Sequence, residues 1–279
     1  MSGWLPVAPC TPRDCAYHEG AVRPPLPAAG LLAAGCAVTL LGLLCAPAAL
    51  LLGPGHRDRL VRRWARAVVR AFGVRIRVTG APVERVRPPT GELVVANHVS
   101  WLDIPLLAAV LPARMLAKSE IRSWPVLGPV AALGGTLFIE RDRLRALPDA
   151  VRTLAGALGA GSRVAVFPQG STWCGRSAGG RFRPAAFQAA VDAGASVRPV
   201  RISYRTGRTN GSGAAAFVGD DPIAASLWRV VTAAGLIAEI HVMPQFSAAD
   251  EPDRRALARA AQSAVASESA NLPPSSVHH

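Results

Sequence analysis

The chain has 279 residues, half of them hydrophobic, which is enough apolar side chain for a buried core and excludes disorder over most of its length. Its 31 basic and 18 acidic residues give a net charge of +13, and Lys118 is the only lysine, so nearly all of the positive charge is arginine. This charge favours an anionic partner, either nucleic acid, acidic lipid headgroups or phosphorylated small molecules. The aromatic content of 5%, without interleaving of basic and aromatic residues, argues against nucleic acid.

The five cysteines are an odd number, and two of them, Cys36 and Cys45, lie within an apolar run. No pair has a spacing typical of a metal site, so we expect neither a disulfide framework nor a bound metal. A reducing compartment is the simpler interpretation. Cys174 has no partner visible in the sequence and is assigned no role.

A polar N-terminal segment, residues 1–25, precedes an uncharged apolar run over residues 26–52. This run exceeds the roughly 20 residues that a helix needs to cross a bilayer. It is also longer, and starts later, than the apolar core of a cleaved signal peptide. We therefore expect a membrane anchor, either a single membrane helix or a helical hairpin broken near Pro47.

Six arginines lie within residues 53–72, directly after the apolar run. By the positive-inside rule the rest of the chain is expected on the cytoplasmic face of the cell membrane, in contact with anionic lipids. Leu60, Trp64, Val68 and Phe72 follow at four-residue steps, which predicts a basic amphipathic helix. Its apolar stripe suits the headgroup boundary, and it suits equally a helix that packs on the domain.

Residues 73–268 alternate short β-branched runs with helical stretches. Because strand, helix and strand in alternation imply right-handed crossovers, we expect an α/β domain whose mostly parallel seven-stranded sheet is flanked by helices. The expected strands cover residues 74–79, 92–96, 113–117, 136–140, 163–167, 197–203 and 237–243.

The spacing of leucine and valine predicts one helix over residues 147–158, and Pro184 and Gly194 stand where a second helix would begin and end. Residues 205–215 are expected to form a flexible insertion, and residues 269–279 a flexible tail. The sequence contains no phosphate-binding loop, zinc-protease helix or nucleophile elbow, which removes the commonest nucleotide, protease and hydrolase interpretations.

Residues 97–103, Asn-His-Val-Ser-Trp-Leu-Asp, directly follow the apolar strand 92–96. His98 is therefore expected at the carboxyl end of a strand, where open α/β sheets place their sites. On one continuous helix His98 and Asp103 would be about 140° apart, so a loop must fold between them if they are to pair. The carboxylate would then bind one imidazole nitrogen and leave the other to take a proton from a hydroxyl. The alternative is structural, with Asp103 capping a helix over residues 104–111 or forming a capping pair with Ser100.

These residues resemble the NHx4D signature of the PlsC-type glycerolipid acyltransferases, and the resemblance extends over roughly residues 60–245. The second block of that family, a glycine and an apolar strand ending in arginine, is similar to residues 135–141. Its third block, FPEGT, is similar to residues 167–172, and its fourth, an apolar run around a proline, to residues 197–200. The four blocks stand in the family's order.

This resemblance implies transfer of an acyl group from a thioester, acyl-CoA or acyl-carrier protein, to the free hydroxyl of a lysolipid, with no metal or bound cofactor. It implies that His98 is the catalytic base, oriented by Asp103, and that Arg141 contacts a phosphate. For Arg141 the alternative is an exposed residue of a basic face. The resemblance also points to an acceptor-binding block formed by Gln169, Gly170, Ser171 and Thr172.

Two positions depart from the family pattern. Gln169 stands where the family usually carries glutamate, and Thr172 where arginine is frequent among members that acylate lysophosphatidate. Because glutamine lacks the negative charge, we expect an intact His-Asp pair with either a differently bound acceptor or slower turnover. Three arginines that follow, Arg176, Arg181 and Arg183, either supply positive charge to the acceptor or are exposed loop residues.

The sequence thus predicts a membrane-associated O-acyltransferase of phospholipid biosynthesis. Its default acceptor is 1-acyl-glycerol-3-phosphate, which would give phosphatidate, and the second acceptor is another lysolipid such as lyso-ornithine lipid. A protein of a different class, a non-catalytic basic membrane-binding protein, would share the positive charge and the apolar run. The sequence predicts no oligomeric state.

Overall fold

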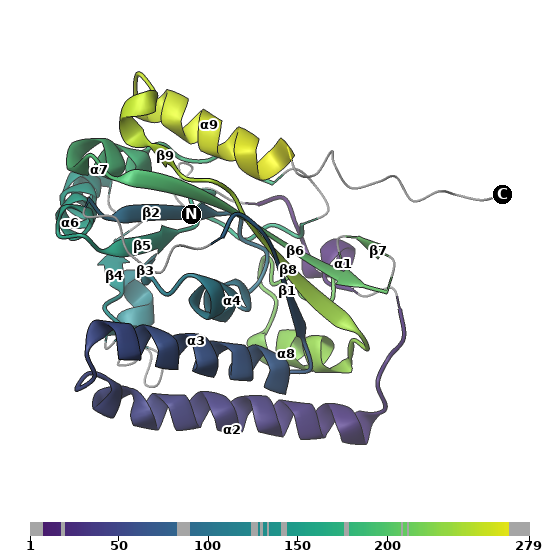
Figure 1. The fold of residues 1–279 in the computed structure, drawn as a ribbon. Coiled ribbons are helices and arrows are strands. Elements are labelled where there is room, and N and C mark those ends of the chain that lie inside the picture. Colours follow the sequence, from purple (N-terminus) through teal and green to yellow (C-terminus); the bar gives the residue numbers. More distant parts are fainter. Residues whose placement is uncertain are drawn as a thin grey trace.

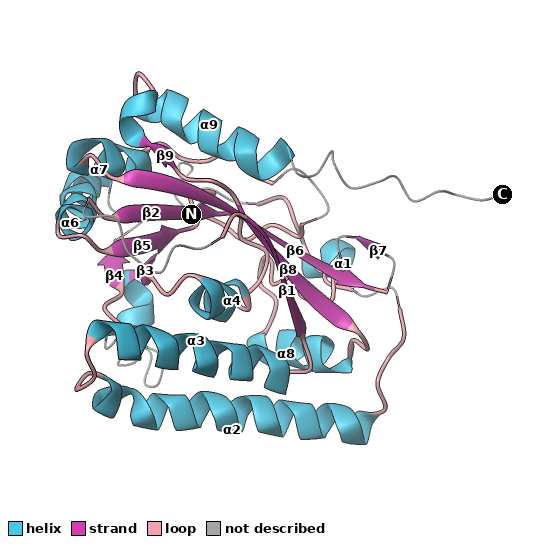
Figure 2. Ribbon diagram, viewed as in Figure 1, coloured by secondary structure: helices cyan, strands magenta, loops and turns pink. Residues whose placement is uncertain are grey.

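A nine-stranded sheet with helices on both faces forms the body of the protein (Figures 1 and 2). The structure is a computed structural model, which describes residues 8–17, 20–82, 90–123, 128, 131–132, 134–140, 144–175, 179–207, 209–210 and 212–267. One face is covered by α2 (Pro25–Ala49), α3 (Pro54–Ala71), α4 (Asp103–Val110) and α8 (Ile223–Thr232). The other face is covered by α6 (Leu147–Gly159), α7 (Ala185–Ala193) and α9 (Arg254–Ser267).

The strand order is β1-β8-β6-β2-β5-β3-β4, and neighbours along it are parallel except β8 with β6. All seven predicted strands are present, and β6 differs most because it continues to residue 206. The expectation of seven strands is wrong by two, since β7 and β9 each pair with β6 in antiparallel fashion. The bounds are β1 Arg75–Gly80, β2 Glu92–Ala96, β3 Arg114–Lys118, β4 Leu137–Ile139, β5 Arg163–Val166, β6 Ser196–Thr206, β7 Thr209–Asn210, β8 Leu236–Val242 and β9 Phe246–Ser247.

Strand β2 lies at the centre of the core and is buried at all of its positions. Leu93 and Val95 contact the layer of α6, α7 and α9, whereas Val94 and Ala96 contact the layer of α3 and α4. A continuous apolar strand is what a parallel sheet covered on both faces requires. The one charge on β2, Glu92, is buried and forms ion pairs with two guanidinium groups.

Helices α2 and α3 pack against each other and form a hairpin along one side of the molecule (Figure 1). The Trp64 indole donates a hydrogen bond of 2.9 Å to the Val38 carbonyl, and a Cβ on Gly42 would lie 1.8 Å from the indole nitrogen. The predicted stripe of α3 is therefore used for packing: Val68 and Phe72 are buried, and only Leu60 is exposed. Of the two interpretations of this helix, packing on the domain is the one that the structure shows.

The residues before α2 contact the same domain as the residues after it. Arg23 donates from its backbone to Thr232 and from its guanidinium to the carbonyls of Val231 and Gly73. Helix α2 continues through Pro47, and the chain turns back only after Ala49. The break near Pro47 that a hairpin within residues 26–52 would require is therefore absent, and the apolar run forms one helix that packs on α3.

Some expectations about helices and loops need correction. The predicted helices are present as α6 and α7, although Pro184 precedes α7 as its N-cap residue; α9 was not predicted. Residues 205–215 are not a flexible insertion, because β6 extends into them and Ala214 and Ala215 are fully buried. The predicted tail, residues 269–279, lies outside the described residues.

Candidate active site

The histidine of the NHx4D string lies at the carboxyl end of β2, as predicted. Asn97 fixes the end of this strand, because its side-chain amide donates to the Ile202 carbonyl and accepts from the Ile202 N–H, both at 2.8 Å. The ladder between β2 and β6 ends one residue earlier, where Ala96 pairs with Val200. The amide of Asn97 thus replaces the next pair of backbone hydrogen bonds and holds His98 at a defined position beside β6.

His98 and Asp103 are in contact, and the chain between them is not helical until Asp103. The Nδ1 atom of His98 lies 2.8 Å from Oδ2 of Asp103, which also accepts the N–H groups of Val99 at 2.6 Å and Ser100 at 2.9 Å. The aspartate is fully buried, whereas 22% of the histidine side chain is exposed. The predicted loop is therefore present, and it presents the edge of the imidazole to solvent.

The prediction that Asp103 is the N-cap residue of a helix is wrong. Asp103 is the first residue of α4, and the N-cap position is held by Leu102, which offers no side-chain hydrogen bond. The carboxylate instead accepts N–H groups from residues that precede the helix. Only half of the predicted capping pair with Ser100 is present, since the carboxylate accepts the Ser100 N–H at 2.9 Å whereas the Ser100 hydroxyl accepts the N–H of Leu102 at 3.3 Å.

Tyr204 of β6 completes the surroundings of the carboxylate, a role that was not predicted from the sequence. Its hydroxyl donates to Oδ1 of Asp103 at 2.6 Å. Burial, and then the negative charge of Asp103, raise the pKa of Tyr204 well above 10. The phenol therefore stays protonated and remains a donor at neutral pH. The alternation of Val200, Ile202 and Tyr204 along β6 was the available signal, because it places all three side chains on one face.

The loop after β5 holds His98 from a second direction. The imidazole stacks on Phe167 with ring centroids 4.0 Å apart and an angle of 12° between the planes. The N–H of Trp173 donates to the His98 carbonyl at 2.8 Å. Since β6, α4 and this loop all contact residues 97–103, the position of the imidazole is fixed before any substrate binds.

Gln169 belongs to the same arrangement. Its side-chain oxygen accepts the N–H of His98 at 2.9 Å, its nitrogen lies 3.4 Å from the Gly180 carbonyl, and it is 4% exposed. A Cβ on Gly179 would lie 2.3 Å from that nitrogen, so the contact is close. The glutamine acts as acceptor and donor at once, whereas a glutamate would place an oxygen against the Gly180 carbonyl.

The other predicted acceptor residues follow along the chain. Gly170 has φ +75°, which favours glycine, and its N–H closes a turn onto the Phe167 carbonyl at 3.1 Å. Ser171 and Thr172 are half-buried in the next positions. Arg141 and Arg176 lie outside the described residues, and Arg181 and Arg183 are exposed, as the second interpretation of these arginines expected.

This arrangement can perform base catalysis. With Nδ1 bound to a carboxylate, Nε2 is the imidazole nitrogen that can accept a proton from a substrate hydroxyl. The three N–H groups and one phenol around Asp103 satisfy both carboxylate oxygens without another cation. The negative charge therefore remains available to stabilise an imidazolium when it forms.

Comparison with known proteins agrees with this geometry. The family model described as Acyltransferase matches residues 75–203. A 1-acyl-sn-glycerol-3-phosphate acyltransferase of Neisseria meningitidis serogroup B is 38% identical over 73% of this chain and 78% of the relative. A lyso-ornithine lipid O-acyltransferase of Pseudomonas aeruginosa is 39% identical over 75% of this chain and 78% of the relative.

A solved structure shares the fold. The crystal structure of the 1-acyl-sn-glycerophosphate (LPA) acyltransferase PlsC from Thermotoga maritima matches with a TM-score of 0.65, covering 85% of this chain and 92% of that chain at 17% identity. The α/β fold that carries this His-Asp pair is that of an acyltransferase. The chain belongs to the acyltransferase family, in its PlsC-type branch, as its four sequence blocks predicted.

Proposed function

We propose that the protein is a lysolipid O-acyltransferase that works at the membrane surface. One observation carries this proposal: a fully buried carboxylate binds Nδ1 of His98, and the imidazole retains an exposed edge. The relatives that are 38% and 39% identical over most of their length are named as acyltransferases of lysolipids. A non-catalytic basic protein would have no need of a buried aspartate with four donors.

The reaction follows from the geometry. His98 removes the proton of the acceptor hydroxyl through Nε2 while the oxygen attacks the thioester carbonyl, so the imidazole becomes imidazolium. The tetrahedral intermediate then expels the thiol of the donor, acyl-CoA or acyl-carrier protein, and the leaving sulfur takes the proton back. Asp103 stabilises the imidazolium and holds the ring. Because a thioester is already activated, positioning and proton transfer suffice, and no cofactor is needed.

The default acceptor is 1-acyl-glycerol-3-phosphate, with phosphatidate as product. Arg141 is the residue we propose for its phosphate, since a guanidinium binds two phosphate oxygens at once. Thr172 favours a second acceptor class, because arginine is frequent at this position in relatives that acylate lysophosphatidate. Lyso-ornithine lipid is the acceptor of that class, and a relative named for it is 39% identical.

Helix α2 supplies the contact with the membrane in this proposal. It is the one helix among the described residues that is long and apolar enough to cross a bilayer, yet it packs on α3, and Arg23 just before it hydrogen-bonds to α8. Such a helix fits a position along the surface of one leaflet with its exposed leucines in the acyl-chain region. The arginines of α3 would contact anionic headgroups on the cytoplasmic face. The exposed side chains are Leu26, Leu40, Leu41 and Leu44 on α2, Leu51 just after it, and Arg59, Arg63, Arg66 and Arg70 on α3.

The test is a product analysis with the full chain purified in detergent. Labelled acyl-CoA and acyl-carrier protein are each offered with a panel of lysolipids, and the product is identified by mass. We expect transfer to one lysolipid, its loss in His98→Ala, and unchanged transfer in His56→Ala, which removes an exposed histidine of α3. Both variants should still sediment with anionic vesicles. If the wild-type protein forms no product with any pair of substrates, the proposal is wrong.

Gln169→Glu tests whether the glutamine sets the acceptor or the rate. The carboxylate would keep the N–H of His98 but face the Gly180 carbonyl, so we expect up to about a tenfold fall in kcat/KM or a changed order of acceptors. Gln188→Glu, the same change on the surface of α7, is the control. An unchanged rate and an unchanged order of acceptors would show that this departure from the family has no functional role.

A further inference from the structure

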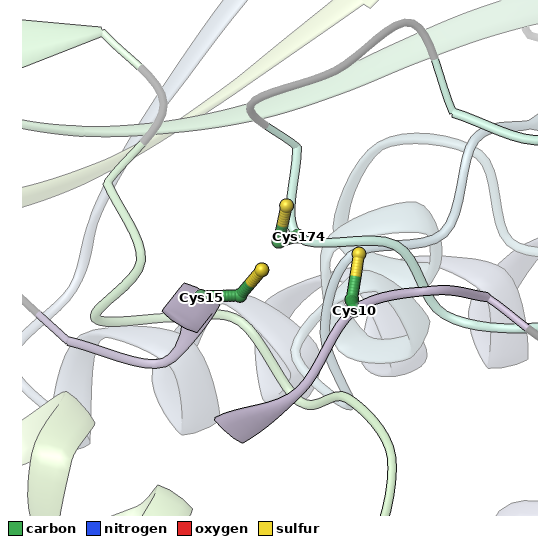
Figure 3. Close-up of side chains that lie close together, drawn as sticks. All are labelled: Cys10, Cys15 and Cys174. Atoms are coloured by element: carbon green, nitrogen blue, oxygen red, sulfur yellow. The ribbon is translucent and has the colours of Figure 1, made fainter. Parts of the chain in front are cut away.

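Three cysteines from two distant parts of the sequence meet beside the loop that holds His98 (Figure 3). Cys10 precedes the short helix α1 (Pro12–Cys15), Cys15 is the last residue of that helix, and Cys174 lies in the loop after β5. Their sulfur atoms are all within 4.8 Å of one another. The expectation that Cys174 has no partner is therefore wrong. The cluster could not be recognised from the sequence because Cys174 is far along the chain from Cys10 and Cys15.

The N-terminal pair is held by the local structure of α1. The side chain of Thr11 accepts the N–H of Asp14, and the N–H of Cys15 donates to the Thr11 carbonyl at 3.0 Å, so one turn of helix separates the two cysteines. The segment lies against the backbone of Gly213, where a Cβ would come within 2.3 Å of the Cys15 carbonyl oxygen. The position of both thiols is thus fixed by close backbone contacts.

The third cysteine is fixed from the side of the active site. Its neighbour Trp173 donates to the His98 carbonyl, and a Cβ on Gly175 would lie 3.4 Å from Val99. Cys174 is buried with Ala216 and Val218, while Cys10 and Cys15 are half-buried against the same cluster. The three sulfur atoms therefore meet over a small apolar base, with the N-terminal segment on one side and the active-site loop on the other.

This geometry fits a soft metal ion. Zinc binds thiolate sulfur at about 2.3 Å in tetrahedral geometry, which places two ligand sulfurs about 3.8 Å apart. From separations within 4.8 Å, movements of about 1 Å reach this arrangement, and side-chain rotation of half-buried cysteines provides them. A disulfide would use two of the three sulfurs and leave the third unexplained, whereas a metal ion uses all three.

We propose that Cys10, Cys15 and Cys174 bind one zinc ion, with the fourth coordination position left to solvent or to another group. The ion would join the segment ahead of α2 to the loop that contacts His98. α1 has no buried residues, so the ion would add a strong link between this short helix and the domain to the backbone contacts at Gly213. The role is structural, and no step of the acyl transfer passes through the metal.

The experiment uses the full chain in detergent, stripped of metal under reducing conditions. Zinc affinity is measured by competition with a chromophoric chelator, and cobalt is added separately to read sulfur-to-cobalt charge-transfer absorption. We expect one zinc per chain and a cobalt spectrum typical of several thiolates. Each of Cys10→Ser, Cys15→Ser and Cys174→Ser should weaken zinc binding on the order of 100-fold or more.

Two cysteines of the same chain provide the controls. Cys36→Ser and Cys45→Ser change exposed cysteines of α2 and should leave zinc affinity and the cobalt spectrum unchanged. Zinc should raise the melting temperature of the wild type and of these controls, and not of the three ligand variants, which separates loss of a ligand from loss of the fold.

Three results would overturn the proposal. These are less than half a zinc per chain in the wild type, tight zinc binding that survives Cys174→Ser, and a disulfide between any two of the three cysteines in the untreated protein by mass spectrometry. A site that takes copper(I) but not zinc would overturn the assignment to zinc. None of these readouts depends on acyl transfer, so the proposal stands or fails apart from the proposed function.

Discussion

Asp103→Asn removes the charge of the candidate dyad while the hydrogen bonds around it can be kept. With its oxygen toward His98, Val99 and Ser100, the asparagine still accepts their N–H groups. Its nitrogen then faces Tyr204, whose hydroxyl can turn from donor to acceptor. The fold and the orientation of the imidazole are therefore expected to survive, and what is lost is the stabilisation of the imidazolium.

The size of this loss can be worked from the geometry. A unit charge at about 4 Å from the imidazolium, at an effective dielectric constant of about 20, contributes about 4 kcal/mol. Because about 1.4 kcal/mol in the barrier is a factor of ten in rate, we expect kcat to fall by roughly 1000-fold. The fall should appear in kcat and leave KM largely unchanged, since the imidazolium forms only during the reaction.

The assay is the initial rate of acyl transfer at saturating thioester, with melting temperature measured in parallel. Asp149→Asn is the control, because it makes the same chemical change at an exposed carboxylate of α6 and should leave the rate unchanged. An Asp103→Asn enzyme within tenfold of the wild type, with the fold intact, would refute the reasoning. His98 would then act without the support of the buried charge.

Three further changes test other parts of the structure. Tyr204→Phe removes a buried hydrogen bond to a carboxylate worth about 1.5–3 kcal/mol, so kcat/KM should fall by about 10- to 100-fold, and a rate near wild type would contradict a positioning role. Glu92→Gln leaves two buried guanidinium groups uncompensated and should lower the free energy of unfolding, measured with denaturant, by about 3–5 kcal/mol. A decrease below about 1 kcal/mol would show that the two guanidinium groups find other partners. Gly42→Ala places a Cβ 1.8 Å from the Trp64 indole and should destabilise the packing of α2 on α3 by about 1–3 kcal/mol in thermal unfolding. Gly30→Ala is the control, because a Cβ there has no atom within 4 Å. Equal melting temperatures of the two variants would disprove this packing.

Features that depend on residues close together in the chain could be predicted from the sequence. The strands follow from short β-branched runs, and the helices α6 and α7 from periodicity and from glycine at their ends. The contact between His98 and Asp103 belongs to this class, since five positions separate them and the required loop lies within the motif. The four family blocks indicated the acyl-transfer chemistry, and each of them can be recognised because it is a short run of consecutive residues.

Contacts between distant segments could be identified only from the folded chain. Tyr204 reaches Asp103 from a strand about 100 positions away, and Cys174 meets Cys10 across more than half of the chain. The antiparallel pairing of β6 with β8 is of the same kind. Such contacts produce no recognisable residue spacing in the sequence, because any number of residues can separate the two segments that meet. An aspartate, a tyrosine and a cysteine in isolation are chemically unremarkable, and it is the fold that makes them neighbours.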